Sequence, residues 1–276
     1  MANENYVSAI NTDALFVPAK AATVYAAHES SLFLGGELIP VVNAPNGVLQ
    51  VPELAAVTGQ TVSAEGTVDL ETRLPAQTKN TITCNLYGAR AVVRDLGAID
   101  PSEIGRSLGN AVSAEFDKDV MNVIGDLTAQ EITDAAGLSV DEIAKAVGAI
   151  RGAGETGQLY GIVAASHYAT LMSDIGSTAF AGGDVFQGQA LRSGFFGNIM
   201  GVQLFVSSYM DDTNTGVTAA RAAIFSADAM RIAMQKNVDI EVARRAEAVG
   251  NDVVASLHAA CGLIDAGRGR MLVDAA

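Results

Sequence analysis

The sequence predicts an α+β fold in which a long β-hairpin and one long helix precede a glycine-rich α/β body. Two extended runs between residues 41 and 96 enclose a polar stretch, which predicts the hairpin. A helix start at Asp100, followed by an apolar stripe of about seven turns, predicts the long helix. Beyond it, short strands and two further helices are predicted, with many of the chain's 28 glycines between them.

The composition excludes several classes of protein. The chain has 276 residues, of which 49% are hydrophobic, so it can bury a core without disulfides or metal. Its net charge of −14 argues against binding to nucleic-acid phosphates or to anionic lipid. No apolar stretch is long enough to span a membrane, and the N-terminus lacks the pattern of a secretory signal. Cys84 and Cys261 are expected to be partly buried free thiols.

The first 40 residues have weak periodicity, with one short amphipathic stretch at 19–31. Such a segment is either a frayed terminus or an arm that becomes ordered on a partner. The hairpin that follows has a polar tip at 61–74 and a β-rich run at 81–87. Because a long two-stranded arm cannot stabilise itself in water, we expect it to lie on another subunit.

The long helix has the clearest start in the chain. Asp100 is a good N-cap, Pro101 suits the first turn, and Glu103 can complete a capping box. Apolar residues follow at three-and-four spacing: Ile104, Leu108, Ala111, Val112, Phe116, Val120, Val123, Ile124 and Leu127. The opposite face, expected to be solvated, carries Arg106, Asn110, Glu115, Asp117 and Lys118.

The second half of the chain alternates helices and strands. Ser139 and Glu142 form an S-x-x-E pattern that starts a second helix, and Ser166 is expected to cap a third, shorter one. Strands are predicted at 159–164, 202–206, 222–225, 238–242 and 253–264.

No pattern predicts a cofactor, a metal or a catalytic group. Residues 152–157 spell G-x-G-x-x-G, but this run follows a helix and precedes a strand, the reverse of a dinucleotide site. It is therefore read as the glycine turn that ends a helix. Asp211-Asp212 and Arg244-Arg245 are expected to be solvated or paired at the surface. The three histidines lie far apart in the sequence, at His28, His167 and His258.

By its order of elements, the chain resembles the major capsid proteins of tailed bacteriophages, of the Hong Kong 97 type. Residues 46–79 resemble the extended loop that reaches over a neighbouring subunit in that family. Residues 92–96, which lead into the long helix, resemble the junction between a strand and the spine helix. The other matching segments are 116–119 at the end of the spine helix, 163–171 and 197–208 in the axial domain, and 240–264 in the peripheral domain.

The resemblance implies a division of the chain and a set of contacts. The implied segments are an N-terminal arm (1–40), the extended loop with a peripheral strand (41–96), the spine helix (97–130), the axial domain (131–236), peripheral strands (237–263) and a return to the axial domain (264–276). Intersubunit contacts are expected on the loop and the exposed helix face, at Val48, Val51, Glu65, Asp69, Glu71, Arg73, Lys79, Arg106 and Glu115.

The implied function is structural, with no catalysis, cofactor or metal. Pentamers and hexamers of the chain would form the icosahedral shell of the virion, assembled in the host cytoplasm around DNA that is not bound sequence-specifically. A portal protein, a scaffolding protein and possible cement proteins are the expected partners, and no membrane is involved. Tyr168 departs from the usual proline of the family. Lys79 is the only lysine near the loop and lies at its base, so the covalent cross-link of the type member is not carried over.

Two alternatives remain open at this stage. An encapsulin-type nanocompartment would use the same fold to enclose cargo enzymes, with an apolar inner pocket near an N-terminal helix. A soluble α/β enzyme would need a site assembled from distant residues, and His167, Asp211 and Arg244 are its candidates. Such an enzyme should be a monomer or a small oligomer with a concave pocket.

Overall fold

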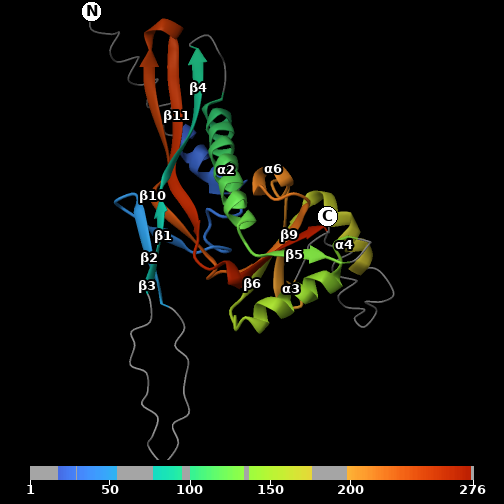
Figure 1. Ribbon diagram of the computed structural model, residues 1–276. Helices are drawn as coiled ribbons and strands as arrows, with labels where there is room; N and C mark the ends of the chain where they lie inside the picture. Colours follow the sequence, from blue (N-terminus) through green and yellow to red (C-terminus); the bar gives the residue numbers. More distant parts are fainter. Residues whose placement is uncertain are drawn as a thin grey trace, which may run out of the picture.

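The computed structural model describes residues 18–28, 30–54, 77–94, 100–133, 137–175 and 198–274. These residues form two sheets, of four and six strands, and a separate two-stranded ribbon (Figure 1). The predicted α+β class is confirmed. No helix in this described part of the chain is long and apolar enough to cross a membrane.

The four-stranded sheet is built around a long hairpin. Its order is β1 (Val41–Asn43), β10 (Met230–Arg245), β11 (Gly250–Leu263) and β4 (Asn85–Arg94), and the last three strands are antiparallel. The tight turn between β10 and β11 is the 3-10 helix Ala246–Ala248. Helix α2 (Pro101–Gly125) lies along the sheet (Figure 1). Facing it, β11 buries every second residue: Val253, Ala255, Leu257 and Ala259.

Helix α2 begins where the sequence predicts. The Asp100 carboxylate accepts a hydrogen bond from the Ser102 N–H at 2.9 Å, and Pro101 occupies the first turn. Most of the predicted stripe is buried, namely Ile104, Leu108, Val112, Phe116, Val120, Ile124 and Leu127. Tyr87 on β4 packs edge-on against Phe116, with ring centroids 5.7 Å apart, and its hydroxyl donates to Asp119 at 2.5 Å.

A helix over residues 18–28 packs against α2 backbone to backbone (Figure 1). A Cβ on Gly105 would lie 2.4 Å from the Ala19 carbonyl oxygen, and one on Gly109 would lie 2.4 Å from the Thr23 carbonyl oxygen. Only glycine therefore permits this approach. Neither expected reading, a frayed end or an arm ordered on a partner, describes 18–28. The helix contacts α2 through the small buried residues Ala19, Thr23 and Ala27. Because these side chains are small, they produce little hydrophobic periodicity in the sequence.

The six-stranded sheet has the order β5 (Ala129–Ile132), β12 (Gly269–Asp274), β9 (Ala220–Ser226), β6 (Leu159–Ala164), β8 (Val202–Ser207) and β7 (Asn198–Ile199). Helices α3 (Val140–Gly152) and α4 (Tyr168–Ile175) share a second core with it, while α6 (Asp212–Thr215) lies toward α2. A 3-10 helix at Ala266–Arg268 leads into β12.

Local signals in this half are mostly confirmed. The Ser139 hydroxyl accepts from the Glu142 N–H at 3.4 Å at the start of α3. The glycine run ends that helix, because α3 stops at Gly152 and Gly154 adopts a φ of 94°. The expected cap at Ser166 is wrong. Ser166 lies inside a 3-10 turn, Ala165–His167, which has no side-chain cap.

Strand β10 begins at Met230, so the expected boundary between residues 236 and 237 falls inside it. The chain crosses between the sheets in the turn after β9, where the Ala229 N–H donates to the Ser226 carbonyl oxygen. The alternation at 238–242 marks only the outer half of β10. In its inner half, Met230, Ile232 and Ala233 are completely buried, whereas Arg231 and Met234 are half-buried.

Gly109→Ala is expected to lower the free energy of unfolding by about 1–3 kcal/mol, because the new methyl group meets the Thr23 backbone. The matched control is Gly148→Ala in α3, where nothing lies within 4 Å and alanine should stabilise the helix by up to about 1 kcal/mol. Urea unfolding of both variants measures the difference. Equal effects would contradict the proposed seat for the N-terminal helix.

Candidate assembly interface

The predicted hairpin stands on the body as a two-stranded ribbon (Figure 1). Strands β2 (Val48–Leu54) and β3 (Gln77–Thr83) pair antiparallel, with Val48 opposite Thr83 and Leu54 opposite Gln77. The ribbon shares no ladder with either larger sheet. Four expected contact residues lie between its strands, outside the described residues: Glu65, Asp69, Glu71 and Arg73.

The two faces of the ribbon differ in burial. One face, called here the exposed ribbon face, presents six exposed residues: Val48, Gln50, Pro52, Lys79, Thr81 and Thr83. The structure thus brings the expected contact residues Val48 and Lys79 onto one surface. Val51, also expected to be a contact, is half-buried on the opposite face together with Leu49 and Ile82. The exposed ribbon face carries one positive charge and no carboxylate.

The ribbon is anchored at its base by a close contact with β11. A Cβ on Gly262 would lie 2.4 Å from Cγ1 of Ile82, so the glycine makes room for the isoleucine. The Asn80 amide donates to the Ile264 carbonyl oxygen at 2.9 Å. The Cys84 N–H, between β3 and β4, donates to the Gly47 carbonyl oxygen at 2.8 Å. These contacts set the direction in which the ribbon leaves the body.

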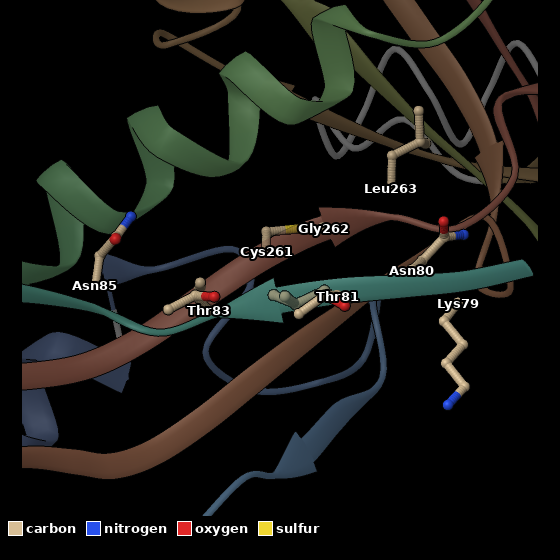
Figure 2. A pocket seen from close by; sticks show the side chains of 10 residues that line it. Lys79, Asn80, Thr81, Thr83, Asn85, Cys261, Gly262 and Leu263 are labelled. Atoms are coloured by element: carbon tan, nitrogen blue, oxygen red, sulfur yellow. The ribbon is translucent and has the colours of Figure 1, made fainter. Parts of the chain in front are cut away.

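A groove of about 380 Å³ lies beside this anchor, between β3 and the end of β11. Figure 2 shows Thr81 and Thr83 on β3 beside Cys261 and Gly262 on β11. Burial raises the pKa of the Cys261 thiol to about 12, and it also raises that of Cys84, so neither is an activated nucleophile. Both cysteines are free and partly buried, as predicted. The polar side chains that line the groove include Asn80, Thr81 and Thr83.

The two α2 residues that were expected to form intersubunit contacts do not lie on the same side of the helix. Arg106 and Glu115 are both exposed, but nine residues on an α-helix place them about 180° apart, at opposite edges of the exposed face. Glu115 pairs with Lys118 at 3.2 Å. Asp117, which was expected on the solvated face, is only 2% exposed. That expectation is wrong because residues 31 and 32 cross the helix at this point.

The three residues considered for an enzyme lie apart in the fold. His167 follows β6, Asp211 caps α6 by accepting from the Asn214 N–H at 2.7 Å, and Arg244 lies near the outer end of β10 in the other sheet. Burial, with the charge of Arg221, lowers the pKa of His167. Among the described residues, no group of three or more His, Cys, Asp or Glu side chains could hold a metal ion.

Sequence reasoning missed the glycines and their partners. Gly262 lies inside a strand, where glycine often marks close approach of another segment. Gly105 and Gly109 are four residues apart on a helix, the spacing that lets two helix backbones touch. Both signals are present in the sequence, but neither says which segment makes the approach.

Comparisons with known proteins agree with this architecture. Residues 89–268 match a family model described as phage capsid protein, which is well over half of the chain. The chain therefore belongs to this family of phage capsid proteins. A search of curated proteins found no match.

Several solved structures share the fold. A Mycobacterium phage Che8 chain has a TM-score of 0.64 at 18% identity, covering 82% of this chain and 84% of its own. The capsid of cyanophage P-SCSP1u has a TM-score of 0.66 at 15% identity, covering 88% of both chains. A virus-like particle from Pyrococcus furiosus also reaches 0.66, at 12% identity, covering 93% and 98%. The expected Hong Kong 97-type fold and the assignment as a phage major capsid protein are confirmed.

Gly262→Ala is expected to displace the base of the ribbon and to cost about 1–3 kcal/mol of unfolding free energy, because its methyl group would overlap Ile82. Adding Ile82→Ala should recover part of that loss by making room. Gly88→Ala is the control, since the nearest atom to its Cβ is 3.7 Å away. Thermal unfolding compares the variants, and a double variant less stable than the sum of the singles would contradict the contact.

Proposed function

We propose that this chain self-assembles into the icosahedral shell of a phage virion, and that the ribbon and the loop it carries clamp neighbouring subunits. The observation that carries the proposal is the anchored ribbon, with one face held on β11 and the other exposed. An isolated two-stranded ribbon is at best marginally stable in water, so a neighbouring subunit would stabilise it. Chain length alone limits the reach of residues 55–76 beyond the ribbon to about 40 Å, if they formed two equal extended legs.

The solved structures support assembly from many copies. Those similar to this chain include a phage capsid and a virus-like particle, and both are built from subunits of this fold. In such a shell, pentamers and hexamers of this chain would bury surface mostly against copies of themselves. The net charge of −14 suits a container for DNA, because it offers no net attraction to phosphates. This function is structural and needs neither catalysis nor a cofactor.

The proposed domains follow the sheets. The peripheral domain would comprise the helix at 18–28, α2 and the four-stranded sheet, and the axial domain would comprise the six-stranded sheet with α3 and α4. The portal, scaffolding and cement proteins remain proposed partners, and the virion remains the proposed location. Residues 1–17 remain the proposed arm.

Light scattering followed by negative-stain electron microscopy of the purified chain tests assembly. Hollow shells, or rings of five and six, would support the proposal. A small oligomer of fixed size at every concentration and salt would contradict it. DNA inside virus-derived particles would favour a phage shell, whereas an enclosed enzyme would favour the nanocompartment alternative.

Replacing residues 55–76 with an Asn-Gly turn should abolish particles while the body stays folded, because the turn closes β2 onto β3 and removes only the loop. A Gly/Ser segment of the original length is the control that separates the loop's sequence from its length, and it should also fail to assemble. Electron microscopy counts particles and circular dichroism reports the fold. Normal particles from the Asn-Gly variant would refute the clamp.

A further inference from the structure

Asp117 is a buried carboxylate at the point where the N-terminal segment crosses α2. Its residue is 2% exposed. The Ser31 hydroxyl donates to one of its oxygens at 2.5 Å, and the Leu32 N–H donates to the other at 3.1 Å. Both donors belong to the turn that directly follows the N-terminal helix.

The Ser31 hydroxyl also forms hydrogen bonds to the backbone of its own turn. Its hydroxyl oxygen accepts from the Phe33 N–H at 3.2 Å and from the Leu34 N–H at 3.1 Å, while its proton goes to Asp117. Ser30 and Ser113 add a hydroxyl–hydroxyl hydrogen bond of 2.7 Å. We call these contacts of residues 30–34 with Ser113 and Asp117 the N-terminal latch.

The charge of Asp117 is poorly compensated within the latch. An ionised carboxylate has about four lone-pair sites, and the described residues supply this one with two donors and no cation. Ionisable groups on the two helices have partners of their own: Lys118 pairs with Glu115, and Lys20 pairs with Asp239. Asp119 accepts from Tyr87, and the His28 ring is hydrogen-bonded to Asn237. Burial raises the pKa of Asp117 to about 6, although the two hydrogen bonds act in the opposite direction.

The helix that the latch holds has few other strong attachments. Its seat on α2 consists of Ala19, Thr23 and Ala27, and small side chains bury little apolar area. Lys20 reaches Asp239 at 2.9 Å, but the lysine side chain is 46% exposed, and such ion pairs contribute little. Phe33, in contrast, is completely buried and fixes the chain directly after the two residues that donate to Asp117. Opening therefore lifts the N-terminal helix together with Ser31 and Leu32 and leaves the rest of the fold in place.

We propose that the N-terminal latch is a protonation-dependent device that holds the N-terminal helix on the spine helix α2 more tightly when the Asp117 carboxyl is protonated. Opening exposes this carboxyl to water, where its pKa returns to the ordinary value of about 3.9. The closed state has the higher pKa and so takes up a proton first. Acid thus favours closure, and the added hold is lost as the pH rises through about 6.

The proposal goes beyond the shell function and does not depend on the loop. Residues 1–17, the proposed arm, precede this helix. With the latch closed, the arm would start at a fixed point on α2. With the latch open, the helix would be released as well and would lengthen the arm. Control of that starting point by pH would act on each subunit separately. It would operate whether or not the ribbon clamps a neighbour.

Hydrogen exchange of the full-length chain, followed by mass spectrometry, tests the latch. Amides of 18–31 are compared at about pH 5 and about pH 7.5 in one assembly state, after correction for the intrinsic exchange rate. The opening equilibrium should be about tenfold smaller at the lower pH. Amides of β6 provide an internal reference that should not follow this change.

Three variants make the test specific. Asp117→Asn should remove the pH dependence, because its side chain is neutral throughout. Glu115→Gln makes the same charge change on an exposed carboxylate of the same helix and should behave as wild type. If Asp117→Asn does not fold, Ser31→Ala replaces it and should open more at both pH values. Wild-type opening that is unchanged or greater in acid would overturn the proposal, as would pH dependence that survives in Asp117→Asn.

Discussion

The close approach of two backbone segments to α2, at three glycines of that helix, is the constraint on which the rest of the structure depends. Gly105 and Gly109 admit the N-terminal helix, and Gly125 admits α6, because a Cβ there would lie 2.0 Å from the Thr215 carbonyl oxygen. The buried apolar stripe of α2 covers the inner face of β11 and β4. One helix thus supports elements from both halves of the chain. Any side chain at these glycines would push the segments apart.

Two carboxylates of α2 fix how the neighbouring elements are aligned on this helix. Asp119 accepts from Tyr87 on β4, and Asp117 accepts from Ser31 and Leu32. One therefore ties the helix to the sheet and the other ties it to the N-terminal segment. Apolar contacts alone would allow these elements to slide, whereas hydrogen bonds to a carboxylate require a particular register. The stretch 116–119, noted in the sequence for its resemblance to a spine helix, thus has a physical role in this chain.

Many ionisable groups of the described residues have a structural role in the fold. They form ion pairs, as Arg90 does with Asp252 and Arg221 with Asp274, or cap turns, as Asp211 and Asp265 do. The ribbon, in contrast, has an exposed face that carries polar and small apolar side chains and one lysine. In the proposed shell, this face would lie against another capsid subunit.

The sequence by itself determined the kind and order of most elements, because caps, glycine turns and alternation act within a few residues. Asp100, Ser139 and the run at 152–157 mark their helix ends correctly for that reason. Only the tertiary structure decided which surfaces are buried. Ser31 and Asp117 are 86 residues apart, and no local pattern tells a buried aspartate from a solvated one on the same helix. Likewise Gly262 signals a close approach, but the approach of Ile82 exists only once β3 has crossed β11.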